Sequence, residues 1–81
     1  MEKYNEIIEE IRNIRGLRNA FKVEYDNTKD SIYLNFTNAK AFRILDNEDS
    51  KMFERFKMVI DYNNVEYEFK SYGSIEIYFS E

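Results

Sequence analysis

Residues 57–80 read KMVIDYNNVEYEFKSYGSIEIYFS, and apolar and polar residues alternate along most of this stretch. Successive side chains of a strand point to opposite faces, so a period of two is typical of a sheet that buries one face. Asn63-Asn64 fits a two-residue turn, because Asn tolerates the positive φ angle that such turns need. Gly73 fits the left-handed position of a three-residue loop over residues 71–73. The pattern therefore predicts a three-stranded β-meander over residues 57–80.

One register of this meander puts its large apolar side chains on the same face. The opposed apolar pairs are Tyr62–Val65, Ile60–Tyr67 and Met58–Phe69 in the first hairpin, and Phe69–Ile75, Tyr67–Ile77 and Val65–Phe79 in the second. A slip of one residue would move this whole set to the opposite face, so the register is strongly specified.

A helix and a hairpin are predicted upstream of the meander. Residues 2–15 carry apolar residues three and four positions apart, which is typical of an amphipathic helix, and Gly16 follows as a C-terminal cap. The alternation with a period of two begins at Phe21. A hairpin that pairs Tyr25 with Ile32 puts the apolar side chains of both strands on one face.

The segment between this hairpin and the meander is less clear. Residues 39–45, AKAFRIL, fit either a strand or a helix, and the shortness of the run favours a strand. Asp46-Asn47 and the acids that follow predict the start of a second helix, over about residues 47–56. The helical period also allows this helix to continue to Tyr62, but the meander explains residues 57–62 better.

These elements give one domain and one fold class. The chain has 81 residues, which is too short for two independent cores, so we predict a single domain over residues 1–81. Seven Phe and seven Tyr supply large side chains for its core. The predicted fold class is α+β: a mostly antiparallel sheet with the C-terminal β-meander 57–80, packed by two short helices over about residues 2–15 and 47–56.

The composition excludes several kinds of site. The chain has no Cys and no His, so disulfides, thiolate or imidazole catalysis and the usual zinc sites are ruled out. We expect no catalytic residue, no metal site and no cofactor, and therefore no enzymatic activity. The N-terminal residues are charged, and no run approaches the ~18 apolar residues of a membrane span. We therefore expect a cytoplasmic protein that does not enter the membrane.

The polar face of the predicted meander carries the candidate partner-binding residues. In the predicted register this acidic face consists of Asp61, Glu66, Glu68, Glu76 and Tyr78. Glu68 lies directly across from Glu76, and like charges in that position repel each other. Such a face suits the basic surface of a protein partner. The alternative is a solvated surface on which Lys57 and Lys70 relieve the repulsion.

The chain also has one basic cluster, which consists of Arg12, Arg15, Arg18 and Lys22. Cations placed in this way can contact a phosphate backbone. The favoured interpretation is that they complement the dipole of the first helix and pair with nearby acids such as Glu9.

The charge balance favours a protein partner. Twelve Lys and Arg against sixteen Asp and Glu give a net charge of −4, which disfavours direct binding to nucleic acid. The sequence therefore favours a small acidic protein-binding module that covers a basic surface of its partner. An inhibitor or a nucleic-acid mimic of the phage or mobile-element type acts in this way. Two alternatives stay open: a nucleic-acid-associated accessory protein that uses the arginine cluster, and a self-associating structural subunit, such as a homodimer formed through an edge strand.

Overall fold

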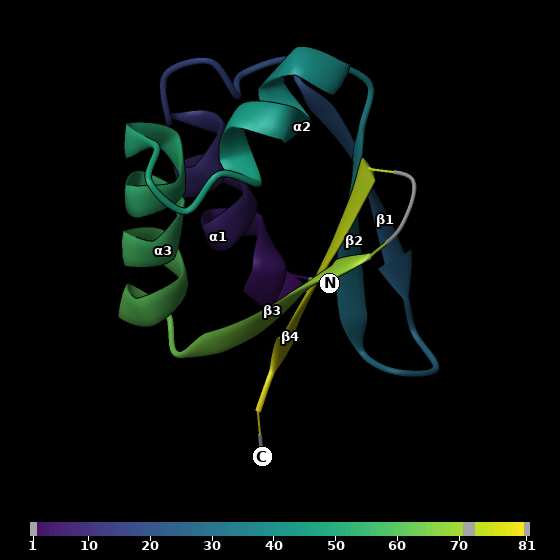
Figure 1. The fold of residues 1–81 in the computed structure, drawn as a ribbon. Coiled ribbons are helices and arrows are strands. Elements are labelled where there is room, and N and C mark those ends of the chain that lie inside the picture. Colours follow the sequence, from purple (N-terminus) through teal and green to yellow (C-terminus); the bar gives the residue numbers. More distant parts are fainter. Residues whose placement is uncertain (1, 71–72, 81) are drawn as a thin grey trace.

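Within residues 2–70 and 73–80, which the computed structural model describes, three helices cover one face of a four-stranded antiparallel sheet (Figure 1). In chain order the elements are α1 (Glu2–Arg12), β1 (Phe21–Asp26), β2 (Ser31–Phe36), α2 (Ala39–Leu45), α3 (Lys51–Tyr62), β3 (Val65–Lys70) and β4 (Ser74–Phe79). The predicted α+β fold class with an antiparallel sheet is confirmed.

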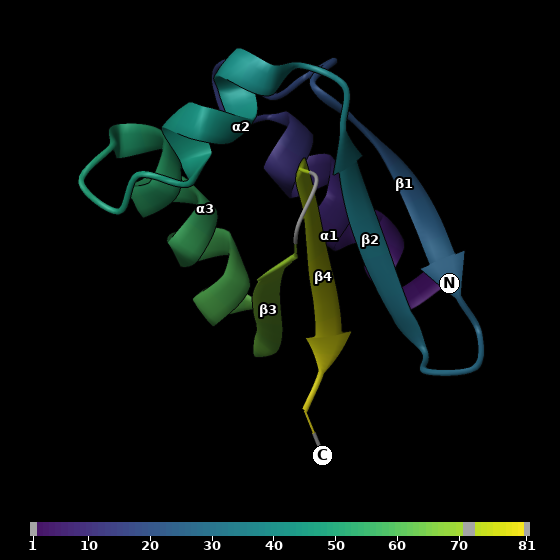
Figure 2. The same ribbon diagram turned by 45° about the vertical axis from the view of Figure 1, so that its right-hand side comes forward.

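The sheet joins two hairpins, and its strands lie in the order β1-β2-β4-β3. Figure 2 shows how β2 and β4 lie side by side in the centre, while β1 and β3 form the two edges. The helices α2 and α3 connect one hairpin to the other, and α1 precedes both. Because every helix packs on the same side, the sheet has an inner face against the helices and an outer face opposite to them.

The predicted pairings of β1 with β2 and of β3 with β4 are confirmed, whereas the pairing of residues 58–62 with residues 65–69 is not. Tyr25 lies opposite Ile32 in the hairpin of β1 and β2. In the hairpin of β3 and β4, the opposed apolar pairs are Val65–Phe79, Tyr67–Ile77 and Phe69–Ile75, as the alternation predicts. Gly73 has a φ of 80°, the left-handed conformation expected of it. The rest of the predicted loop, residues 71 and 72, lies outside the described residues.

The first strand of the predicted meander is wrong, because residues 57–62 belong to α3. Both a period of two and a helical period fit this segment, and burial decides between them. Phe56 and Ile60 lie one helical turn apart and are 0% and 2% exposed, respectively. Met58, which the strand would have buried, is 65% exposed. The helix ends at a C-cap on Asn63, and Asn64 uses its positive φ of 58° to lead into β3 rather than to close a hairpin.

The segment before α3 also differs from the prediction. Residues 39–45 form α2 and not a strand, because Ala41 and Leu45 are buried one helical turn apart and Asn38 caps the helix. The Asn38 side chain accepts a hydrogen bond of 3.0 Å from the backbone N–H of Ala41. The next helix starts at Lys51 and not near residue 47, because Ser50 is its N-cap and accepts a bond of 3.0 Å from the backbone N–H of Phe53.

The first helix is shorter than predicted. The helix α1 ends at Arg12, and residues 13–20 form turns that lead to β1, with Gly16 at a φ of 95°. Ile14 and Leu17 are still buried after the helix ends, so the apolar period continues in residues that are no longer helical.

Helices and strands share one apolar core. The buried apolar residues are Tyr4, Ile7, Ile11, Ile14, Leu17, Ala20, Phe21, Ile32, Leu34, Ala41, Leu45, Phe56, Ile60, Val65, Ile75 and Ile77. Aromatic rings continue this core along the inner face of the sheet, and Phe36 and Phe42 illustrate their tilted packing with ring centroids 5.3 Å apart.

A polar network around Asp30 fastens α1 to the turn between β1 and β2. The Tyr4 hydroxyl donates to the Asp30 carbonyl oxygen at 2.6 Å, and the Tyr25 hydroxyl donates to Asp30 Oδ1 at 3.0 Å. Lys3 completes the network with an ion pair to the same carboxylate. The hydrogen bonds from Lys3 and Tyr25 hold the pKa of the Asp30 carboxyl below its usual range.

Candidate partner-binding surfaces

The outer face of the sheet brings together four of the five residues predicted for the acidic face. Glu66 lies opposite Tyr78, and Glu68 lies opposite Glu76, on β3 and β4. The fifth, Asp61, is wrongly placed by the prediction because it belongs to α3, on the other side of the sheet. There Asp61 Oδ1 accepts a hydrogen bond of 2.9 Å from Lys57 Nζ, one helical turn away.

Glu76 is the central polar residue of the outer face. It is only 6% exposed, and its Oε2 accepts a hydrogen bond of 2.8 Å from the Ser31 hydroxyl. Lys70 Nζ lies 3.5 Å from Glu76 Oε1 and 3.3 Å from Glu68 Oε1. The predicted repulsion between the two carboxylates is therefore relieved by a lysine that contacts both.

The two neighbouring carboxylates change the pKa of Lys70. Its hydrogen bond to Glu68 and the charges of both carboxylates raise the pKa of its ammonium group, although partial burial works in the opposite direction. The same residues line a shallow hollow of about 330 Å³, where Lys29 adds a second positive charge. Because two lysines face two glutamates in this hollow, the outer face is less acidic than the sequence predicts.

A second acidic surface, which is not among the predicted sites, lies on α3 and the turn before it. A hollow of about 450 Å³ is lined by Glu48, Asp49, Ser50, Phe53, Glu54, Lys57, Met58 and Asp61. Met58 and Tyr62 are exposed by 65% and 80%, respectively, and lie one helical turn apart. We call this region the α3 surface and define it by Glu48, Asp49, Glu54, Met58, Asp61 and Tyr62. The helical spacing of Glu54, Met58 and Tyr62 could have predicted this surface. These residues share a face only in a helix, whereas the meander prediction places residues 57–62 in a strand.

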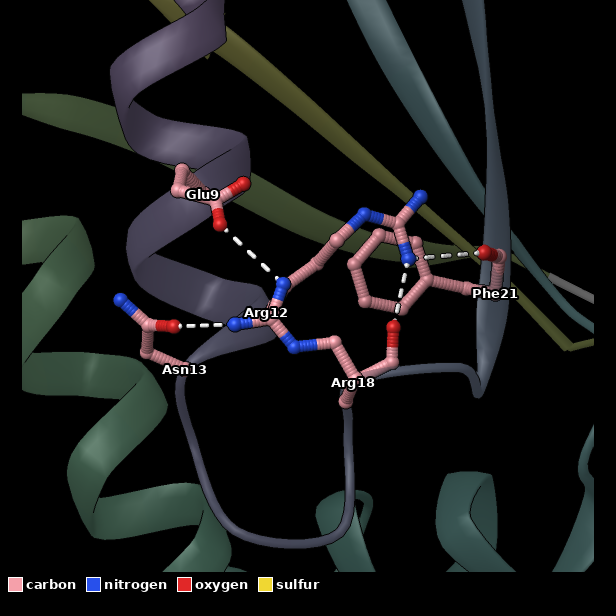
Figure 3. Close-up of polar contacts among 5 residues, drawn as sticks. All are labelled: Glu9, Arg12, Asn13, Arg18 and Phe21. Carbon is pink, nitrogen blue, oxygen red and sulfur yellow. Dashed lines mark hydrogen bonds and ion pairs between the residues drawn. The ribbon is translucent and has the colours of Figure 1, made fainter.

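The predicted basic cluster is not one surface, and two of its arginines hold the connection from α1 to β1 (Figure 3). Arg12 Nη1 donates to the backbone oxygens of Arg18 and Phe21, at 3.0 and 3.2 Å. Its guanidinium carbon lies 4.3 Å from the centroid of the Phe21 ring. Arg18 in turn donates to Asn13 Oδ1 at 2.6 Å and to Glu9 Oε2 at 3.1 Å. Both arginines therefore stabilise the connection between α1 and β1.

The other two members of the basic cluster lie apart from them. Lys22 is exposed on the edge strand β1, opposite Asn35. Arg15 lies in the turns after α1 and lines a hollow together with Lys51 and Arg55 of α3. The sequence prediction therefore grouped side chains that serve three separate places in the fold.

Two kinds of feature are absent from the part of the chain that the structure describes. Among residues 2–70 and 73–80, no group of three or more acidic side chains is placed to hold a metal ion. Within the same ranges, no helix has both the length and the apolar character needed to cross a membrane.

Comparison with known proteins assigns no family to this chain. No protein-family model matches it, and no curated protein or solved structure is significantly similar to it.

Proposed function

We propose that this chain is a small protein-binding module that uses the α3 surface to engage a partner with a basic contact segment. The observation that carries the proposal is the exposure of Met58 and Tyr62, at 65% and 80%, together with the carboxylates that line the hollow beside Met58. Tyr and Met are enriched in protein interfaces, where an apolar centre is surrounded by a polar rim.

The rim defines the chemistry of the partner. Four carboxylates and one lysine line the hollow next to Met58, and Lys57 is already paired with Asp61. A segment that carries Lys or Arg on either side of an apolar residue complements this arrangement. Its cations would meet the rim while its apolar side chain fills the centre. Charge complementarity of this kind speeds association and selects the partner.

The net charge of −4 supports the same proposal at long range, because it attracts a basic protein and repels nucleic acid. If the basic segment is itself the partner's nucleic-acid site, the module acts as an inhibitor and as a nucleic-acid mimic. The outer face is the second candidate surface, because Glu66 and Glu68 are exposed on the edge strand β3. Its weakness is the lysine pairing around Glu76, which leaves little free acidic charge in the hollow.

The experiment compares the two surfaces with matched variants. A partner is captured from cells that express the tagged chain, and its affinity is then measured with purified proteins. Met58→Ser with Tyr62→Ser should weaken binding at least tenfold, which is about 1.4 kcal/mol. Glu54→Gln with Asp61→Asn should mainly slow association and reduce its dependence on salt.

The control is Glu66→Gln with Glu68→Gln, which removes the same charge from the outer face. It should leave the affinity within twofold of the wild type. If the control pair weakens binding and the two α3 pairs do not, the outer face is the contact surface and the proposal is wrong.

A further inference from the structure

A basic hollow lies between the turns after α1 and the first turns of α3. It has a volume of about 340 Å³ and is lined by Ile14, Arg15, Lys51, Met52 and Arg55. Three of these five side chains are cations, and none is an acid. In a chain with a net charge of −4, this local excess of positive charge is opposite to the overall balance.

The three cations take part in no ion pair in the described part of the chain. The ion pairs among residues 2–70 and 73–80 join Lys3 to Asp30, Arg18 to Glu9, Lys57 to Asp61, and Lys70 to Glu68 and Glu76. Arg15, Lys51 and Arg55 are exposed and take part in none of them. Like charges held together without a partner repel one another, and a bound anion would relieve that repulsion.

The backbone adds to the positive potential of the basic hollow. Lys51 is the first residue of α3, so the hollow lies at the positive end of the helix dipole. Arg15 comes from a segment 36 positions earlier in the chain and is brought here by the turns after α1. Guanidinium groups match the oxygens of a phosphate with paired hydrogen bonds, and an ammonium group supplies a further charge.

An apolar hollow adjoins the basic one across Met52, which lines both. It has a volume of about 190 Å³, and its lining includes Gly16, Ala41 and Ile44, with Lys40 at one side. Gly16 lies close to Met52, since a Cβ at this glycine would be 2.8 Å from Met52 Cε. The flexible thioether of Met52 therefore separates a charged compartment from an apolar one.

We propose that the two hollows bind one phosphate monoester with an aromatic body, a ligand of mononucleotide size. Arg15, Lys51 and Arg55 hold the phosphate group. The aromatic part lies against Met52 and Ile44, where a sulfur atom and an aliphatic side chain can pack on its face. The overall negative charge favours a single phosphate in this place over a long polyanion.

The test is a titration with AMP, followed by amide NMR spectra and calorimetry at low salt. AMP should shift the amide signals of residues 14–16, 41–44 and 51–55. Arg15→Gln with Arg55→Gln should weaken AMP binding at least tenfold. The matched control, Lys22→Gln with Lys29→Gln, removes the same charge from other places and should stay within twofold of the wild type. Dispersed amide spectra of each variant verify that it is folded.

Two further probes separate the compartments. Inorganic phosphate should bind more weakly than AMP and shift only residues 14–16 and 51–55. Ile44→Asn should weaken AMP binding but leave phosphate binding unchanged. Equal affinity for AMP and phosphate would overturn the assignment of the apolar hollow.

Other outcomes would overturn the site as a whole. The proposal fails if AMP shifts no amide signals up to about 10 mM, or if the double arginine variant binds as well as the control. It also fails in its choice of ligand if a short single-stranded oligonucleotide binds through the same residues more tightly than AMP. The hollow of the α3 surface shares no lining residue with these two hollows, so none of these outcomes bears on the protein-binding function.

Discussion

Met58 and Ile60 together test whether α3 extends to Tyr62. In α3, Ile60 is 2% exposed and belongs to the apolar core, whereas Met58 is 65% exposed. Ile60→Ala removes buried methyl groups and leaves a cavity, at a cost of about 2–5 kcal/mol. Met58→Ala removes a side chain that is mostly in solvent, and should change the free energy of unfolding by no more than about 0.5 kcal/mol.

The effect on thermal unfolding follows from the size of the domain. In a domain of 60–100 residues, each 1 kcal/mol shifts the Tm by about 4–8 °C, so a loss of about 3 kcal/mol lowers it by roughly 12–24 °C. The Tm is measured by circular dichroism at 222 nm. If Ile60→Ala is too unstable to purify, Ile60→Val should cost about 1 kcal/mol and still be measurable.

A strand over residues 57–62 gives a different result. On a strand, Met58 and Ile60 share the buried face, so their substitution by Ala would destabilise the protein to a similar degree. Comparable losses of Tm for Met58→Ala and Ile60→Ala would therefore refute the helix. They would also refute the α3 surface, which depends on Met58 pointing into solvent.

Two further predictions concern polar groups. Glu76→Gln should destabilise the protein by about 1–2 kcal/mol, because a buried carboxylate that contacts Lys70 loses its charge. Glu68 is exposed, so Glu68→Gln should be nearly neutral. Urea unfolding of both variants measures the difference, and equal losses of stability would contradict it. The pKa of Asp30 is lowered in the folded state, so its contribution to stability is present above its unfolded pKa near 3.8 and is lost as the pH falls through the lower folded value. The Tm of Asp30→Asn should therefore fall less than that of the wild type between about pH 5 and pH 2. An equal fall in both proteins would show that the ionised Asp30 carboxylate, with its contacts to Lys3 and Tyr25, does not stabilise the fold.

The sequence predicts the sheet well where only one period fits. Residues 65–70 alternate strictly, and no helical arrangement buries Val65, Tyr67 and Phe69 together, so the register with β4 follows from the sequence alone. Residues 57–62 fit both periods. The choice between strand and helix depends on tertiary packing, because Phe56 and Ile60 fill the core from a helix. Local alternation of apolar residues carries no information about this packing.

The candidate sites also contain features that the sequence predicts and features that only the packed structure shows. Glu68 and Glu76 could be placed together because strand register fixes which residues lie opposite each other. The contact of Lys70 with both carboxylates depends on side-chain conformation, which the pattern does not contain. Arg15 and Arg55 come together only through the packing of the turns after α1 against α3, so their basic hollow could not be foreseen from the spacing of cations along the chain.

The central claim is that partners bind to the α3 surface, and photocrosslinking from single positions tests it most directly. A photoreactive side chain at residue 58 lies within the α3 surface, and one at residue 66 lies on the outer face of the sheet. Both positions are exposed, so neither substitution should disturb the core. After irradiation in cells, residue 58 should give a covalent adduct with a protein whose crosslinked peptide is rich in Lys or Arg, and residue 66 should give little. Adducts from residue 66 with none from residue 58 would contradict the proposed function.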